Sequence, residues 1–329
     1  MRATSSLFIA IVMTSACGGD PTQATMTDSS TGGFASMPPT TSVSDSDSDS
    51  AATDTPTTGH VSGGLKFDVG PGGSSSTGGP ADAGCKRVDV VLSIDNSSSM
   101  QEEIAALAGP VFDSFPQALL DVGNGLEDFQ LAVIDACNNP PYLHDTGAGG
   151  ACNYSTGANY MSSASPTLLD EYHCVTELTQ TGYMGMPDQC SGDNDDEQPA
   201  NTAADAVSPP AAAENAGFVR ADAVLFVVAI TDEDEQPVPD QSAQEIMDKL
   251  VAAKGTVDNV VFLGIGGGSS CEGPYGSADD AVRLREVATL FQAADRGLFW
   301  DLCQGDLEMA FQAALAVVDS ACIEFDPPG

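Results

Sequence analysis

The sequence predicts an α/β protein built on a doubly wound, mostly parallel sheet with helices on both faces. Two observations support this prediction. Apolar runs of strand length recur between residue 86 and the end of the chain, and segments with apolar residues at every third or fourth position lie between them. Strands that alternate with helices favour parallel pairing, and runs that are apolar throughout are typical of strands covered on both faces.

Five segments are expected to form the strands. The first three are nearly continuous apolar runs, at 88–94, 129–134 and 223–230, and the last of these reads AVLFVVAI. Two further strands are expected at 257–265 and 298–302. Their lengths and apolar character match strands buried inside a sheet.

Amphipathic helices are expected between and after these strands. The segment after the first strand has apolar residues at helical spacing, although Pro110 and Pro116 should kink or split the helix. Later helices are expected around three further sets of apolar residues. The four sets are Ile104, Leu107, Val111 and Phe115; Ile246 and Leu250; Leu284, Val287 and Phe291; and Leu307, Phe311, Leu315 and Val318.

The composition divides the chain into three parts. Residues 1–17 have the pattern of an export signal, and residues 18–84 are rich in Ser, Thr, Gly, Pro and Asp. Such a segment cannot bury enough apolar surface to offset its ordering entropy, so residues 18–84 are expected to be a disordered linker. Residues 85–329 are expected to form one domain with a disulfide-rich insertion at 136–198, on the rim where the second strand ends.

The export signal resembles that of a bacterial lipoprotein. Arg2 precedes an apolar run at 7–13 that is too short to span a bilayer, and small residues lead to Cys17. The resemblance implies lipid on Cys17 and a place in the cell envelope, with the outer membrane favoured and the lipid as the only membrane contact. Ordinary cleavage and secretion of a soluble protein is the alternative.

Cysteine usage also points to an oxidising compartment. The chain has 9 cysteines, so removal of Cys17 leaves an even set, which is typical of disulfides. The spacings do not match a zinc site. A straight final helix starting near Asp306 would hold Cys322 too far from Cys303 for a bridge, unless the helix ends early and the chain folds back. The favoured pair is Cys85 with Cys322, which leaves Cys303 to pair on the rim side, where Cys271 is the candidate.

The charge balance excludes nucleic acid as a partner. Ten Lys and Arg face 48 Asp and Glu, a formal net charge of −38. Such a chain repels nucleic acid and anionic membrane surfaces. The acidity suits divalent cations, but it equally suits a surface that only keeps the protein soluble.

Oxygen-bearing side chains follow two of the expected strands. The first strand leads into Asp95, Ser97 and Ser99, and the third leads into an acidic run that begins at Asp232. Strands that are adjacent at a topological switch point would bring these side chains together. Carboxylate and hydroxyl oxygens suit Mg²⁺ better than zinc.

These two segments, DNSSSM after VVLSI and ITDEDE after AVLFVV, resemble the metal-ion-dependent adhesion site of von Willebrand factor type A domains, and the similarity covers roughly residues 86–325. The resemblance implies that Asp95, Ser97, Ser99 and Asp232 hold Mg²⁺ or Mn²⁺, with Ca²⁺ a further possibility. It also implies a threonine ligand, for which Thr181 is the candidate. An acidic group of a protein partner would complete the coordination.

Other interpretations of the same residues remain open. Ser99 and Glu102 fit a capping box, which would make this stretch a plain helix start. Glu102 and Glu103 match the place of ligands for an adjacent ion in the similar integrin domains, but carboxylates at a helix start are also explained by the helix dipole. The glycines at 264–268 superficially match a dinucleotide loop but are expected only to permit a tight strand exit.

Three functions are compatible with this sequence. The favoured one is a cell-envelope or secreted binding protein, not an enzyme, that engages an acidic group of a protein partner through its metal ion. A metal-dependent hydrolase is the second, but no His, Cys or Lys near Asp232 completes a nucleophile arrangement. The third is a structural envelope module with a vestigial metal loop.

Overall fold

A computed structural model describes residues 84–97, 99–109, 114–122, 125–137, 140–147, 149–178, 197–235 and 241–325. The expected signal peptide and linker lie outside these residues. Cys17 and the candidate ligand Thr181 therefore also lie outside them.

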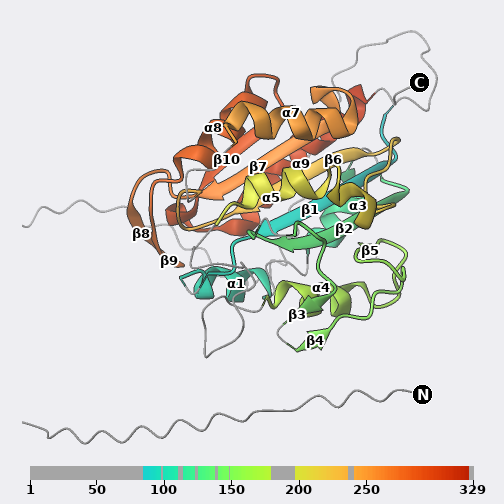
Figure 1. The fold of residues 1–329 in the computed structure, drawn as a ribbon, viewed down its shortest axis with the longest axis horizontal. Coiled ribbons are helices and arrows are strands. Elements are labelled where there is room, and N and C mark those ends of the chain that lie inside the picture. Colours follow the sequence, from blue (N-terminus) through green and yellow to red (C-terminus); the bar gives the residue numbers. More distant parts are fainter. Residues whose placement is uncertain are drawn as a thin grey trace, which may run out of the picture. The chain divides into compact units, whose positions relative to one another are not determined.

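The central sheet has six strands, of which five run parallel. The order across the sheet is β10, β7, β6, β1, β2 and β5, with β5 antiparallel at one edge. The strand bounds are β1 Arg87–Ile94, β2 Asp128–Asp135, β5 Met161–Ser162, β6 Val224–Ile230, β7 Val260–Gly266 and β10 Gly297–Asp301 (Figure 1). The chain extends from β1 to β2 on one side and to β6 on the other, so the predicted doubly wound, mostly parallel sheet is confirmed.

Two strands have bounds that differ from those expected from the sequence. The strand expected from Val257 begins only at Val260, because Val257–Asn259 forms a 3-10 turn that Thr256 caps by accepting from the Asp258 amide. The last strand ends at Asp301 because Leu302–Gln304 forms a second such turn.

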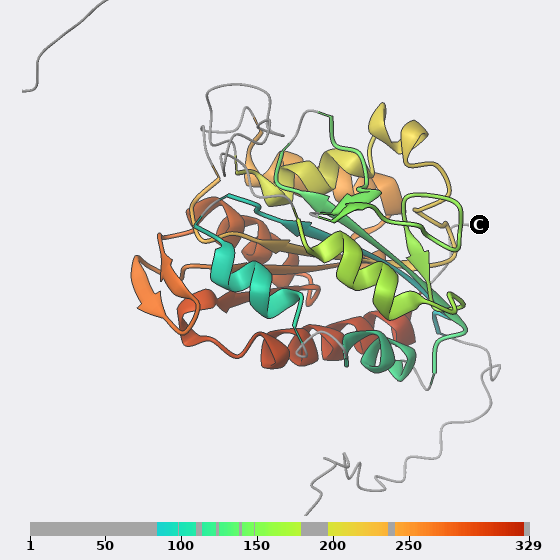
Figure 2. The same ribbon diagram turned by 90° about the horizontal axis from the view of Figure 1, so that it is seen from below.

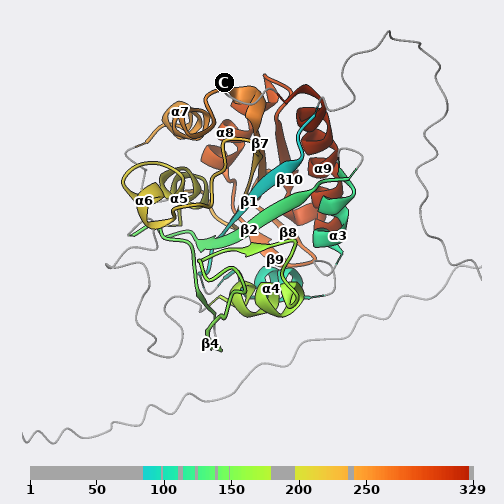
Figure 3. The ribbon, with the colours of Figure 1, turned by 90° about the vertical axis from the view of Figure 1, so that its right-hand side faces the viewer.

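Helices cover both faces of the sheet, as Figures 2 and 3 show. Successive β1 residues belong to different cores: Val90 and Leu92 lie in one apolar cluster, and Val91 lies in the other. The first cluster is covered by α1 (Gln101–Leu107), α3 (Phe115–Leu120), α4 (Leu168–Thr176) and α9 (Leu307–Glu324). The second is covered by α5 (Pro199–Ala206), α7 (Ala243–Lys254) and α8 (Val282–Gln292). Burial on both faces explains why the strands are apolar throughout.

The helix ends follow local signals. Ser242 and Glu245 form a reciprocal capping box at the start of α7, and Gly255 ends that helix at a φ of 81°. In the region of the two prolines, α1 ends at Leu107 and α3 begins at Phe115 with Pro116 in its first turn, where proline is tolerated. The expected interruption of this helix is therefore observed.

The insertion is more ordered than its composition predicts. It forms a small hairpin, β3 (Thr146–Gly147) with β4 (Gly150–Ala151), followed by β5 and α4. The disulfide between Cys152 and Cys174 links this hairpin region to α4, which confirms that the insertion is cross-linked. The expectation that it lies at the rim is corrected in part, because β5 pairs with Gln130 and Leu131 inside β2. The helix α5 and the short α6 (Ala211–Glu214), which follow the insertion, were not expected.

Both predicted disulfides are present. Cys85, before β1, is bonded to Cys322 in α9, and Cys271 is bonded to Cys303. The Cys85 amide also donates to the Cys322 carbonyl at 2.7 Å, so backbone and side chain join the two ends of the domain. In the part of the chain that the structure describes, no helix is both long and apolar enough to cross a membrane.

The glycine-rich exit of β7 leads to a hairpin, β8 (Cys271–Gly273) with β9 (Gly276–Ala278), and not to a helix. A Cβ on Gly267 would lie 2.0 Å from the Asp279 carbonyl oxygen, so the backbone approaches too closely for any side chain. The glycines thus permit a tight strand exit, as expected.

Candidate metal site

The site lies where β1 and β6 end side by side. The two strands pair in parallel through Ile94 and Ile230, and the Asp95 amide continues the pairing by donating to the Ile230 carbonyl at 2.9 Å. Parallel neighbours end at the same edge, so the loops that begin at Asp95 and Thr231 leave the sheet together. Asp95 and Asp232, which were predicted to meet at a switch point, therefore follow two adjacent strands.

Asp95 is buried and held through both carboxylate oxygens. Its Oδ1 accepts from the Ser97 amide at 2.8 Å, and its Oδ2 accepts from the Thr231 hydroxyl at 2.8 Å. The Thr231 hydroxyl in turn accepts from the Glu233 amide at 3.1 Å. Thr231 therefore orients Asp95. Thr231 directly precedes Asp232 in the sequence, but no role was predicted for it.

Two serine hydroxyls connect the first loop to the second. The Oγ atoms of Ser97 and Ser99 lie 2.9 Å apart, and the Ser99 hydroxyl donates to Asp232 Oδ1 at 3.2 Å. The capping-box interpretation of Ser99 is wrong. The residue that precedes α1 is Met100, and no side-chain capping bond is found among the described residues there. The Ser99 hydroxyl points to the acidic loop instead.

A third carboxylate, that of Glu197, completes the cluster. One ligand atom each from Asp95, Glu197 and Asp232 lies within 4.8 Å of the other two, and all three residues are buried. Glu197 was not predicted as a site residue from the sequence. The sequence feature that could have indicated Glu197 is an acidic residue two positions before Pro199, which lies in the first turn of α5. The buried residues of that short helix are mainly alanine, with one proline, one asparagine and one threonine, so it lacks the large apolar side chains that indicated the predicted helices.

The three carboxylates are electrostatically unfavourable together. Burial raises the pKa of Asp95 to about 7, and the Asp232 charge adds to the increase. Burial also raises the pKa of Asp232 to about 6. For Glu197, burial and the charges of Asp95 and Glu233 raise the pKa to about 9. A divalent cation would stabilise the ionised forms of all three groups.

Two more carboxylates lie at the start of α1. Glu102 is exposed, whereas Glu103 is 1 % exposed. Burial, followed by the charge of Asp232, raises the pKa of Glu103 to about 8. Glu103 is thus electrostatically coupled to the same rim.

The spacing of the oxygens suits a small divalent ion. In octahedral coordination with metal–oxygen bonds of about 2.1 Å, adjacent ligands lie about 3 Å apart and opposite ligands about 4.2 Å apart. The separations of 2.9 Å from Ser97 to Ser99 and 3.2 Å from Ser99 to Asp232 match adjacent ligands. Carboxylate and hydroxyl donors are those that Mg²⁺ and Mn²⁺ prefer, and Ca²⁺ accepts the same oxygens at longer distance.

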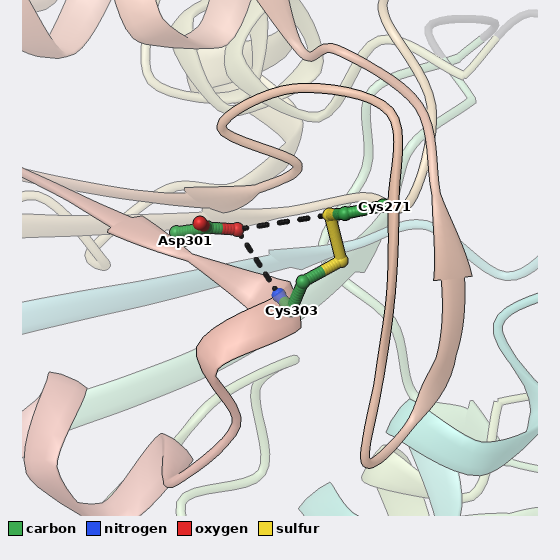
Figure 4. Close-up of side chains that lie close together, drawn as sticks. All are labelled: Cys271, Asp301 and Cys303. Atoms are coloured by element: carbon green, nitrogen blue, oxygen red, sulfur yellow. Dashed lines mark hydrogen bonds between the residues drawn. A yellow bond between two sulfur atoms is a disulfide. The ribbon is translucent and has the colours of Figure 1, made fainter.

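A second cluster of metal-ligand residue types has another explanation. Cys271, Asp301 and Cys303 lie together beside the β8–β9 hairpin, but the two sulfur atoms form a disulfide (Figure 4). Asp301 Oδ1 accepts from the Cys303 amide at 3.1 Å and from the Gly268 amide at 3.2 Å. Because disulfide sulfurs are not thiolate ligands, this cluster stabilises the loop.

Fold and site together define the class of protein: an α/β protein whose parallel sheet ends, at two adjacent central strands, in a buried group of carboxylates and hydroxyls. No protein-family model matches the chain, and no curated protein matches it.

Two solved structures are distantly similar. Proximal thread matrix protein 1 from the mussel byssus matches with a TM-score of 0.40 and 14% identity over 72% of this chain and 49% of its own. The manganese-loaded TRAP protein of Plasmodium vivax matches with a TM-score of 0.34 and 14% identity over 72% of this chain and 74% of its own. The chain therefore spans about half the length of the first of these chains.

Proposed function

We propose that this chain is a binding protein that holds Mg²⁺ or Mn²⁺ at Asp95, Ser97, Ser99 and Asp232 and uses the ion to engage an acidic group of a protein partner. The observation that supports this most strongly is the hydroxyl of Ser99, which joins the first loop to Asp232 at 3.2 Å. Four oxygen ligands from two adjacent strand ends leave coordination positions for water or for a partner.

The chemistry of the site favours binding over hydrolysis. Among the described residues, the side chains that hydrogen-bond to Asp95 and Asp232 are the hydroxyls of Thr231, Ser97 and Ser99. A hydrolase needs a nucleophile or general base that lies beside the reacting atom and is not itself a metal ligand. The raised pKa values of Asp95 and Asp232 would suit proton transfer, but both carboxylates serve as ligands when the ion is bound. Buried carboxylates around a metal ion act first as ligands. The structural alternative, a vestigial loop, would leave the carboxylates without a counter-ion.

Calorimetric titration of the purified chain with Mn²⁺ and with Mg²⁺, after treatment with a chelator, tests the proposal. We expect saturable binding of one ion per chain. The ion should also raise the unfolding temperature, because binding at a hundredfold excess over the dissociation constant stabilises the folded state by about 2.7 kcal/mol. Only weak, non-saturating binding would rule out the site.

We further propose that Cys17 carries lipid and holds the domain at the cell envelope. The three described disulfides agree with a location outside the cytoplasm. Replacement of Cys17 by Ser is expected to move the protein from the membrane fraction to the soluble fraction. A wild-type protein that is already soluble after export would contradict the lipid anchor and support the secreted alternative.

A further inference from the structure

Glu197 is held at the metal site by the chain around it. The amide of the next residue, Gln198, donates to the Ala136 carbonyl at 3.1 Å, at the end of β2. The Ala200 amide donates to Glu235 Oε1 at 2.7 Å, in the loop that follows β6. The start of α5 is thus attached to both neighbouring strand ends, and the position of Glu197 follows from these attachments.

The Glu197 side chain is directed into the cluster and is incompletely satisfied. It is 6 % exposed, and it shares a hydrogen bond with Ser97 of the first loop. Its Oε2 atom is buried and has no hydrogen-bond partner among the described residues. A buried acceptor without a donor is unfavourable, and an ion bound between Glu197, Asp95 and Asp232 would satisfy it.

The charge of the filled site limits what else can bind. A divalent ion is neutralised by Asp95 and Asp232, so Glu197 already makes the group negative by one charge. A fourth carboxylate, from a partner, would make it negative by two in a buried place, where like charges repel strongly. Glu197 and an acidic partner therefore compete for the same ion.

We propose that Glu197 is an internal ligand that occupies one of the coordination positions left open by the four proposed ligands and repels a partner's carboxylate from the other, so that the site is closed until Glu197 is displaced or neutralised. This proposal rests on the proposed function, because it presupposes an ion at Asp95 and Asp232. It adds a regulation of the site: simple carboxylates are excluded, and only a partner with further contacts opens it.

The test compares the full chain with two variants loaded with Mn²⁺. Glu197→Gln keeps the side-chain size but removes the charge. Glu102→Gln is the matched control, because it removes one charge from an exposed carboxylate on the same rim. Mn²⁺ affinity is measured by titration, and the number of metal-bound waters by water-proton relaxation. The probe is a tripeptide with one glutamate between two glycines, and its glutamine counterpart is the control.

The wild-type chain is expected to bind Mn²⁺ and not the glutamate peptide. Glu197→Gln should bind Mn²⁺ about tenfold more weakly or worse, gain at least one bound water, and bind the glutamate peptide but not the glutamine peptide. Glu102→Gln should behave as the wild type does. If Glu197→Gln does not fold, Glu197→Asp retracts the same charge by one methylene and should also gain a bound water.

The outcomes separate this proposal from the proposed function. Equal Mn²⁺ affinity and equal hydration in the wild type and Glu197→Gln would overturn the role of Glu197 and leave the metal site standing. If Glu197→Gln gains a metal-bound water but does not bind the glutamate peptide, the proposed competition between Glu197 and a partner's carboxylate is wrong. Absence of Mn²⁺ binding in the wild type would overturn both proposals.

Discussion

Replacement of Asp95 by Asn is expected to weaken the binding of Mg²⁺ and Mn²⁺ by at least about a hundredfold, while the domain stays folded. Asp95 supplies a full negative charge at the centre of the cluster, and an amide oxygen is a weaker ligand. The Thr231 hydroxyl, which donates to Asp95 Oδ2 at 2.8 Å, can still donate to the amide oxygen. Calorimetry measures the affinity, and circular dichroism checks the fold.

The matched control for this variant is Asp279→Asn. Asp279 is exposed and close enough for its charge to raise the pKa of Asp232, and its amide donates to the Asp232 carbonyl at 2.7 Å. The Asp279→Asn replacement changes the local charge by the same amount as Asp95→Asn without removing one of the four proposed ligands. It should therefore lower the affinity for Mg²⁺ and Mn²⁺ by less than about threefold. An equal loss of metal affinity in both variants would mean that the ion is attracted only by the net negative charge of the region.

Replacement of Arg220 by Met is expected to destabilise the domain by about 3–5 kcal/mol, because it leaves a buried carboxylate without its counter-charge. Arg220 donates from Nε to Asp89 Oδ1 and from its backbone amide to Asp89 Oδ2, both at 2.7 Å. It also donates to the Val88 carbonyl at 3.1 Å and pairs with Asp128. Asp89 lies in β1 and is 0 % exposed.

The destabilisation should depend on pH in a defined direction. Burial raises the pKa of Asp89 from 3.8 to about 6 although Arg220 lowers it, so the pKa rises further when Arg220 is removed. A carboxyl whose folded pKa lies above its unfolded pKa loses stability as pH rises between the two values. For the variant this window extends above pH 6. The decrease in unfolding free energy caused by Arg220→Met should therefore be largest near pH 7.5. It should be smaller at pH 5, where Asp89 is mostly neutral in both the wild type and the variant.

Urea unfolding at these two pH values measures the effect. The control is Arg87→Met, which removes an arginine whose ion pair with Asp222 is exposed, with side-chain exposures of 40% and 54%. Exposed pairs contribute at most about 1 kcal/mol. If Arg220→Met lowers the free energy of unfolding by no more than Arg87→Met does, the stability of the domain does not depend on the pairing of Asp89 with Arg220.

The five parallel strands of the central sheet and the helices α1, α3, α7, α8 and α9 were predictable because each is encoded by a short local pattern. The run at 223–230 is apolar throughout and forms β6 at 224–230. The residues around Leu284 and Phe291 repeat at helical spacing and form α8. The proximity of Asp95 and Asp232 was also predictable, because both follow strands and the order of strands in a doubly wound sheet places those strands together.

Glu197 was not predictable in the same way. Its approach to Asp95 depends on α5, a short helix that buries small side chains instead of large apolar ones, and on the attachment of that helix to Ala136 at the end of β2. Both are consequences of tertiary packing. The insertion was misjudged for a related reason: its Gly, Ser and Asn content indicates loops, whereas α4 and the bond from Cys152 to Cys174 give it structure. The candidate Thr181 stays a prediction.

Diffraction from crystals of the full chain soaked in Mn²⁺ tests the metal site most directly, because the anomalous signal of manganese locates the ion independently of any function. We expect one strong anomalous peak about 2.2 Å from oxygens of Asp95, Ser97, Ser99 and Asp232. The peak should disappear in Asp95→Asn crystals soaked in the same way. Peaks confined to exposed acidic side chains, with none among these four residues, would contradict the account.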